Sequence, residues 1–87
     1  MDPNIESGMV VSSIQEIGGL IRMVRKEQGI NQMVVAGLFG SGNRFVSDAE
    51  NGKKTIQAQK LLDLLSMVGL EVVVRRKRVD GSFGRHC

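Results

Sequence analysis

The sequence predicts a small, mainly α-helical domain of four short helices followed by one β-strand. Apolar residues recur at spacings of three and four between residues 14 and 68, which is the period of helices with one buried face. Glycines at positions 29, 40, 52 and 69 divide this pattern into helix-length pieces. A β-branched run, Val72-Val73-Val74, occurs only after the last of these glycines and favours a strand.

The length and the cysteine count limit how such a domain can be stabilised. A chain of 87 residues forms one domain, and at this size folding buries only about two-thirds of the unfolded surface. A single Cys cannot form a disulfide within the chain, and the adjacent His86 and Cys87 cannot supply the four ligands of a structural zinc site. We therefore expect no metal or cofactor, and oligomerisation is the stabiliser that remains.

The charge balance points to a polyanionic partner and to a soluble location. The net charge is +3 and the isoelectric point is near 9.5, which favours nucleic acid, although a solvated basic surface without a partner is the alternative. No apolar run reaches the roughly 20 residues that span a bilayer, so no membrane contact is expected. The N-terminus does not resemble a signal peptide, and the unpaired Cys fits a reducing cytoplasm.

The first helix follows a flexible N-terminal arm, residues 1–11, which includes a short extended piece at Met9-Val10-Val11. The helix begins at Ser13, because Ser13 and Glu16 have the spacing of a capping box. The residues of its apolar face are Ile14, Ile17, Ile21 and Val24, and those of its other side are Arg22, Arg25, Lys26 and Glu27. The pair Gly18-Gly19 costs helix stability and suggests that a neighbouring backbone approaches closely.

The stretch from Asn31 to Gly52 reads as two short helices joined by a glycine turn. The first runs from Gln32 to Phe39 with Asn31 as its cap, the turn is Gly40-Ser41-Gly42, and the second runs from Asn43 to Asn51. This is the signature of a helix-turn-helix, whose second helix lies in the major groove of DNA. The expected core positions are Val35, Ala36, Phe39, Val46 and Ala49, whereas Met33 and Val34 face solvent, as scattered surface residues or as a partner contact.

The fourth helix is expected to be capped by Thr55 and to end at Gly69, which closes the helical domain of residues 12–69. Its apolar stripe is Ala58, Leu61, Leu62, Leu65 and Val68. A dimerising strand then spans residues 70–77, and a basic, disordered tail spans residues 78–87. Because a lone strand is unstable, we expect it to pair with the same strand of a second chain across a two-fold axis. The predicted dimerisation residues are Leu70, Val72, Val73 and Val74.

The segment from Ile30 to Asn51 resembles the Cro/phage-repressor (XRE) family of helix-turn-helix proteins. The resemblance rests on Gly29-Ile30-Asn31-Gln32, Ala36, Gly40, Val46, Ser47 and Glu50-Asn51-Gly52-Lys53, without insertion or deletion. It implies a lambda-repressor-like bundle of four or five helices that binds operator DNA as a dimer, with Glu50 as a structural glutamate. Two positions depart from the family pattern: Gly42, where a polar residue usually starts the third helix, and Phe45, where Thr or Ser is common.

A narrower resemblance to the HipB-type antitoxins lies in Lys60–Leu65 and Val68–Val74. It implies a strand that pairs between subunits, repression of the antitoxin's own operon, and neutralisation of a HipA-type serine/threonine kinase toxin. A stand-alone phage-like or plasmid-like repressor is the alternative. A third hypothesis is that the chain is a protein-interaction module with weak DNA binding.

Two kinds of DNA contact are expected, because base contacts specify the sequence and backbone contacts position the protein. The predicted base-contacting residues are Asn43, Arg44, Ser47 and Asp48, and the predicted backbone-contacting residues are Gln32, Asn51, Lys53 and Lys54. Gln32 resembles the phosphate-clamping glutamine of the family. Asp48 would have to meet a cytosine amino group or else play a stabilising role, and Phe45 either touches a thymine methyl or packs.

No catalytic arrangement is visible. Asp48 and Glu50 are two residues apart on a helix, so their side chains diverge and cannot act as an acid–base pair. Gly40-Ser41-Gly42 lacks the Lys-Ser or Lys-Thr of a phosphate-binding loop, and no strand precedes it. The sequence therefore predicts a DNA-binding protein without enzyme activity.

Overall fold

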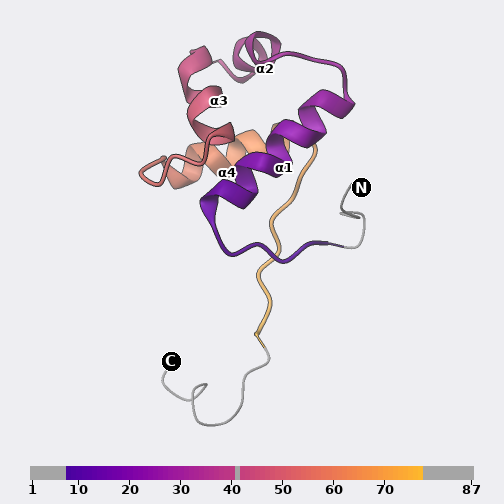
Figure 1. The fold of residues 1–87 in the computed structure, drawn as a ribbon, viewed down its shortest axis with the longest axis vertical. Helices are drawn as coiled ribbons and strands as arrows, with labels where there is room; N and C mark the ends of the chain where they lie inside the picture. The colour runs from indigo at the N-terminus through magenta and orange to yellow at the C-terminus, as the bar shows by residue number, and fades with distance from the viewer. Residues whose placement is uncertain (1–7, 41, 78–87) are drawn as a thin grey trace.

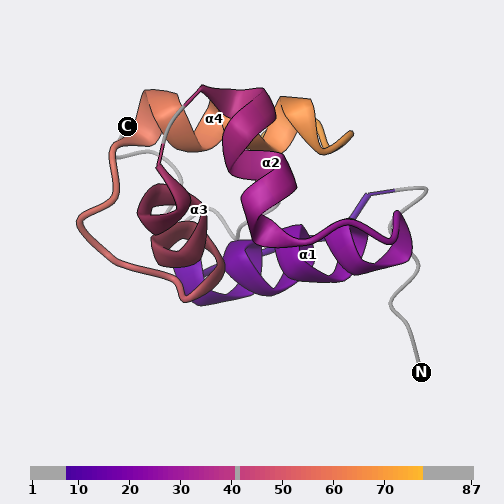
Figure 2. The same ribbon diagram turned by 90° about the horizontal axis from the view of Figure 1, so that it is seen from above.

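The computed structural model describes residues 8–40 and 42–77, and it confirms the predicted mainly helical fold. The described residues form four helices, α1 (Ile14–Glu27), α2 (Gln32–Phe39), α3 (Asn43–Glu50) and α4 (Ala58–Met67). Figure 1 shows the two short helices α2 and α3 at one end of the molecule, next to the longer α1 and α4. Seen from above in Figure 2, α1 and α4 run along opposite sides, and α2 crosses the space between them.

The ends of α1 are set by local sequence. The Glu16 backbone N–H donates to Ser13 Oγ at 3.1 Å, and the Ser13 N–H donates to Glu16 Oε1 at 3.1 Å, so the predicted capping box is present. At the other end Gly29 takes a left-handed conformation with φ of 73°. Since glycine adopts this conformation without a steric penalty, the chain can turn sharply toward α2.

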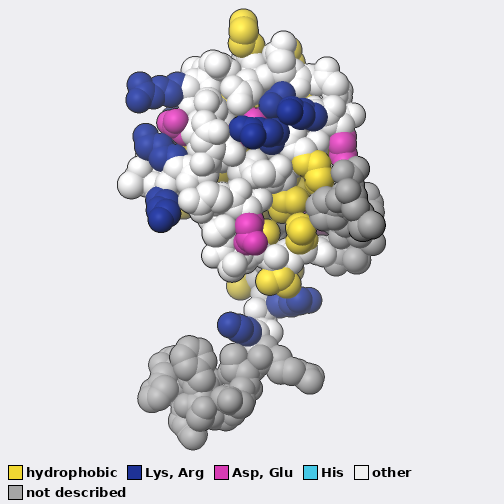
Figure 3. All heavy atoms as spheres, in the orientation of Figure 1, with side chains coloured by type: hydrophobic (Ala, Val, Ile, Leu, Met, Phe, Trp, Pro, Cys, Tyr) yellow, Lys and Arg dark blue, Asp and Glu magenta, His cyan; other side chains and the backbone are white. Residues whose placement is uncertain are grey.

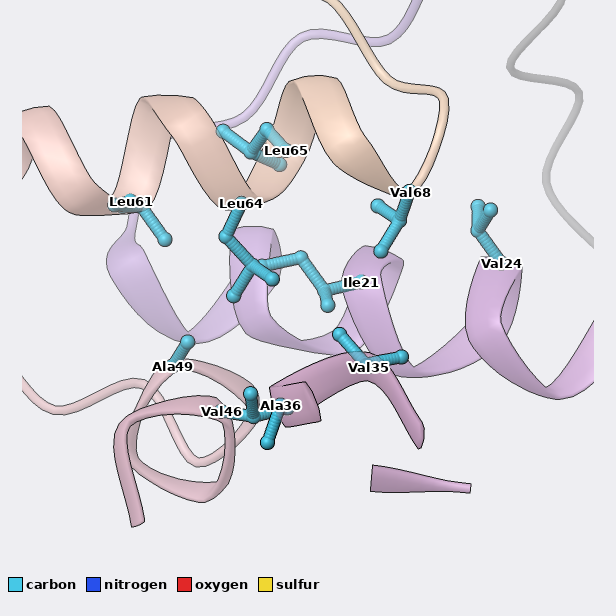
Figure 4. Close-up of a cluster of buried hydrophobic side chains, with 10 residues drawn as sticks. All are labelled: Ile21, Val24, Val35, Ala36, Val46, Ala49, Leu61, Leu64, Leu65 and Val68. Carbon is cyan, nitrogen blue, oxygen red and sulfur yellow. The ribbon is translucent and has the colours of Figure 1, made fainter. Parts of the chain in front are cut away.

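One hydrophobic core receives side chains from all four helices (Figure 4). Its buried members are Ile21, Val24, Val35, Ala36, Val46, Ala49, Leu61, Leu64, Leu65 and Val68. Ile21, Val46 and Leu64 are fully enclosed. Because α2 and α3 each contribute only two of these residues, neither short helix can be stable away from α1 and α4.

The predicted apolar stripe of α4 wrongly included two residues and omitted a third. Leu64 is fully buried, whereas Leu62 is 44% exposed and Ala58 is exposed. The run Leu61-Leu62-Asp63-Leu64-Leu65 fits two helical faces that differ by a rotation, and spacing alone does not choose between them. The face that packs into the core shared with Ile21 and Val35 is the one that contains Leu61, Leu64 and Leu65.

Thr55 does not cap α4, which contradicts the sequence prediction. The helix begins at Ala58, and Gln57 occupies the cap position. The preceding loop is longer than expected, because Ile56 packs against the core and its backbone N–H donates to Lys53 O at 3.2 Å. Anchoring Ile56 in this way places Thr55 in an exposed turn, before the first turn of the helix.

The C-terminal end of α3 lies directly on α1, as the glycine pair suggested. A Cβ atom on Gly18 would overlap the backbone O of Ala49 and lie 2.6 Å from the backbone O of Glu50, whereas a Cβ on Gly19 would have nothing within 4 Å. Position 52 also requires glycine. Its φ is 74°, and a Cβ atom there would lie 2.7 Å from Gln15 Cα. Only Gly18 of the pair is therefore required for the helix contact.

The predicted strand is not seen in the single chain. Residues 71–77 leave the helical body as an extended segment without assigned helix or strand (Figure 1). A strand that pairs across a two-fold axis has its partner in the second copy, so the pairing stays a prediction. Residues 1–7 of the expected flexible arm and the whole expected tail, 78–87, lie outside the described residues.

Candidate nucleic-acid interface

The two helices of the motif are joined as expected from their end residues. Asn31 caps α2, because the Val34 backbone N–H donates to Asn31 Oδ1 at 2.9 Å. Gly40 ends α2 in a left-handed conformation with φ of 78°, and Gly42 then stands at the N-cap of α3. Ser41, between them, lies outside the described residues.

The structure brings the predicted base-contacting residues together on one side of α3. Asn43 and Arg44 are exposed in the first turn, and Ser47 is half-buried one turn later. The opposite side of the helix enters the core through Val46 and Ala49. Helix α3 therefore packs through one side and presents polar side chains on the other.

Asp48, the fourth predicted base-contacting residue, has a partner within the chain. The Lys53 ammonium lies 3.5 Å from Asp48 Oδ2, and the Lys53 backbone N–H donates to the carbonyl O of Asp48 at 3.0 Å. Of the two roles considered for Asp48, this arrangement favours stabilisation of the turn after α3. It also lowers the repulsion that an isolated carboxylate would exert on a phosphate.

Phe45 packs against neighbouring helices. Its ring stacks on Phe39 of α2 with centroids 5.5 Å apart, and the Lys60 ammonium of α4 lies 5.4 Å from the centroid of the Phe45 ring. These contacts favour the packing role over contact with a thymine methyl group. They join the first turn of α3 to α2 and α4.

The predicted backbone-contacting residues surround the two ends of the motif. Lys53 and Lys54 are exposed in the loop after α3, and Asn51 is exposed at the helix end. In Figure 3 basic side chains gather along the edge formed by α3 and this loop. Gln32 is half-buried at the start of α2, and its Nε2 donates to Glu50 Oε1 at 3.0 Å.

Glu50 is the centre of a buried polar network that fixes α3. Its side chain is fully buried and accepts hydrogen bonds from both Nε and Nη2 of Arg25. Arg22 Nε donates to Glu50 Oε1 at 3.3 Å, and Arg22 Nη2 donates to Asn51 Oδ1 at 3.3 Å. The structural role that the resemblance implied for Glu50 is thus present, and the network joins α1, the start of α2 and the end of α3.

Arg25 was wrongly placed on the solvent side of α1. It is 7% exposed, and its Nη1 also donates to the backbone O of Ile30 at 2.8 Å. The helical period of α1 could not show this, since the carboxylate that Arg25 meets lies 25 positions later in the chain. Because a buried charge is costly unless it is paired, the partner decides whether an arginine can enter the interior.

The network also sets the protonation of its members. Burial by itself raises the pKa of Glu50, but hydrogen bonds from Arg25, Gln32 and Arg22 outweigh it and hold the pKa below its ordinary value. The hydrogen bond to Glu50 raises the pKa of Arg25. The pair is therefore ionised at neutral pH, and Arg22 leaves one positive charge in excess on the surface beside Asn51.

Metal sites and membrane-spanning helices were also sought in the described part of the chain. No group of three or more His, Cys, Asp or Glu side chains there could hold a metal ion. None of the helices formed by residues 8–40 and 42–77 is long and apolar enough to cross a membrane. The exposed apolar residues of α2 are Met33, Val34 and Leu38.

Comparison with known proteins assigns the chain to a family. No family model matches it. Over 57 residues, however, it is 46% identical to the uncharacterized HTH-type transcriptional regulator y4mF of Sinorhizobium fredii, an alignment that covers 66% of this chain and 75% of the relative. The chain belongs to the HTH-type transcriptional regulators. This regulator is therefore a member of the class that its helix-turn-helix predicted.

Solved structures share the fold of the regulator. A HipA-HipB-O2-O3 complex contains a chain that superposes with a TM-score of 0.73 at 17% identity, covering 80% of this chain and 99% of the other. A HipB-O4 20mer complex gives a TM-score of 0.72 at 17% identity, again covering 80% and 99%. The fold of the regulator is thus that of HipB, which agrees with the narrower resemblance.

Proposed function

We propose that this regulator binds double-stranded operator DNA as a homodimer and represses transcription. Helix α3 enters the major groove, where Asn43 and Arg44 contact base edges and Ser47 lies one turn behind them. Asn can pair bidentately with adenine, and Arg can pair bidentately with guanine. Two copies of α3 would then meet two half-sites about one helical turn, roughly 34–36 Å, apart.

The observation that carries this proposal is the division of α3 into two sides. Val46, Ala49 and Glu50 are buried and hold the helix, whereas Asn43 and Arg44 are exposed and polar. Lys53 and Lys54 are exposed in the loop after α3 and would contact phosphates, with Asn51 and Gln32 as further backbone contacts. The excess positive charge at Arg22 adds to the attraction for the DNA backbone.

The finer part of the proposal is that the regulator is the antitoxin of a type II toxin–antitoxin module. The similarity of its fold to HipB, solved in a complex with HipA, supports this role. In that role it represses its own operon and neutralises a HipA-like serine/threonine kinase.

Two measurements test these proposals separately. The first is a gel shift of the purified protein on the DNA upstream of its own gene, at several salt concentrations, with a shuffled sequence of equal length as control. An operator-specific shift that weakens steeply with salt supports DNA binding, and equal affinity for both sequences contradicts it. The second is copurification from the native host. A kinase-sized partner supports the antitoxin role, and its absence beside a specific gel shift favours a stand-alone repressor.

A further inference from the structure

Two extended segments, residues 9–11 and residues 71–74, contribute to the lining of one groove at the base of the helical body. The groove has a volume of about 530 Å³, and it is lined by Met9 and Val11 of one segment, by Val72 and Val73 of the other, and by Leu20 of α1. Figure 3 shows hydrophobic side chains exposed around the place where the C-terminal segment leaves the body. Val10 is 78% exposed and Val73 is 75% exposed. Each of the two segments therefore exposes a β-branched side chain to solvent in the single chain.

Within the single chain, the backbone N–H and C=O groups of the two segments do not pair with each other. Among residues 8–40 and 42–77, no backbone hydrogen bond joins residues 9–11 to residues 71–74. Unpaired strand edges seek a partner strand, and a sheet of only two strands is marginally stable. A groove between two such edges therefore has the chemistry to receive one further strand, which would lie about 4.8 Å from each neighbour.

We propose that the strand filling this groove is residues 71–74 of a second copy of the chain, so that Met9–Val11 forms the outer strand of a four-stranded sheet across the dimer. By two-fold symmetry the order is residues 9–11 of one copy, 71–74 of the other, 71–74 of the first, and 9–11 of the other. Each groove is then filled by the strand of the opposite copy. The inference rests on the proposed dimer and adds a strand to it.

The charges and the exposure of the C-terminal segment fit this arrangement. Antiparallel pairing centred on Val73 sets Glu71 opposite Arg75 of the partner subunit, which is a favourable cross-strand pair. The same register sets Val74 opposite Val72 of the partner subunit. Val74 is 92% exposed and Val72 is 55% exposed in the single chain. Pairing would bring Val74 over the groove of the other copy, where it has apolar side chains to contact.

Proline substitution tests the outer strand, because proline removes the backbone donor that a paired strand needs. Of two consecutive residues in a strand, one directs its N–H toward a given neighbour, so both Val10→Pro and Val11→Pro are made. Each is compared with its alanine counterpart, Val10→Ala or Val11→Ala, and Val34→Ala serves as a control for an exposed valine elsewhere. The dimer dissociation constant is measured by analytical ultracentrifugation of the full chain.

We expect at least one proline variant to raise the dissociation constant about tenfold over its alanine counterpart, since each hydrogen bond that is removed occurs twice in the dimer. Circular dichroism should show unchanged helix content, because these residues precede α1. If the wild type dimerises and both proline variants match their alanine counterparts, the outer strand is refuted and the proposed dimer stands. A monomeric wild type would refute both.

Discussion

Gly18 and Gly19 are adjacent in α1, yet replacing each by alanine should change the stability in opposite directions. A Cβ at Gly18 would lie 2.6 Å from the backbone O of Glu50 and closer still to the backbone O of Ala49, both below the 3.0 Å that real Cβ atoms essentially never pass. Neither oxygen belongs to a side chain that could rotate away. The end of α3 would therefore have to move off α1.

The magnitudes follow from two effects with opposite signs. Replacing a helical glycine by alanine stabilises a helix by about 0.8–1 kcal/mol, and Gly19→Ala should gain this amount because nothing lies within 4 Å of its Cβ. At Gly18 the same gain is opposed by overpacking, which costs about 3 kcal/mol at the upper end of its usual range. We expect a net loss of about 2 kcal/mol for Gly18→Ala.

Urea unfolding followed by circular dichroism measures both variants against the wild type. All samples need the same protein concentration, since the stability of the proposed dimer would depend on it. For a domain of this size each kcal/mol corresponds to about 4–8 °C in Tm, so thermal melting gives an independent value. If Gly18→Ala is as stable as Gly19→Ala, the close backbone contact between α1 and α3 does not exist.

Four further predictions concern the DNA-binding surface, the buried network and the dimer. Asn43→Ala and Arg44→Ala should each cost about 1–3 kcal/mol of operator affinity and relax specificity at one position per half-site, and unchanged gel shifts for both would contradict α3 as the base-reading helix. Lys54→Ala should weaken binding to all sequences alike and reduce the salt slope by about 0.9 for each phosphate that is no longer neutralised, twice per dimer; an unchanged slope would remove Lys54 from the interface. Because the folded state lowers the pKa of Glu50, its contribution to stability is complete above the ordinary value of 4.5 and is lost as the pH falls through the folded pKa. Urea unfolding between pH 6 and pH 3 should show this loss, and Glu50→Gln should flatten it. Val73→Pro should convert the dimer to a monomer, and light scattering that still gives the dimer mass would count against strand pairing.

The features that the sequence predicted correctly depend on neighbours in the chain. The capping box of Ser13 and Glu16, the cap at Asn31 and the end of α2 at Gly40 each involve residues within a few positions of one another. Periodicity likewise predicted the buried side of α3, because a short helix with Val46 and Ala49 three positions apart has only one apolar side.

The features that were missed depend on residues far apart in the chain. Arg25 is buried because Glu50 meets it, and Leu64 rather than Leu62 is buried because of how α4 rotates against α1 and α2. Thr55 does not cap α4 because Ile56, one residue later, reaches the core. In the candidate site the exposure of Asn43 and Arg44 followed from the helical pattern, but the pairing of Asp48 with Lys53 did not. Spacing along one helix carries no information about such partners.

The attachment of α3 at its C-terminal end has a consequence for how this protein can change its target. Gly18, Gly52 and the Glu50 network restrict which residues can occupy the end of the helix. Asn43 and Arg44 lie at the other end and are exposed. Under the proposed mode of DNA binding, substitutions at these two positions should alter the preferred operator and leave the scaffold intact. A library randomised only at positions 43 and 44 should retain folded members with new DNA preferences, as a family diverging onto different operators would require.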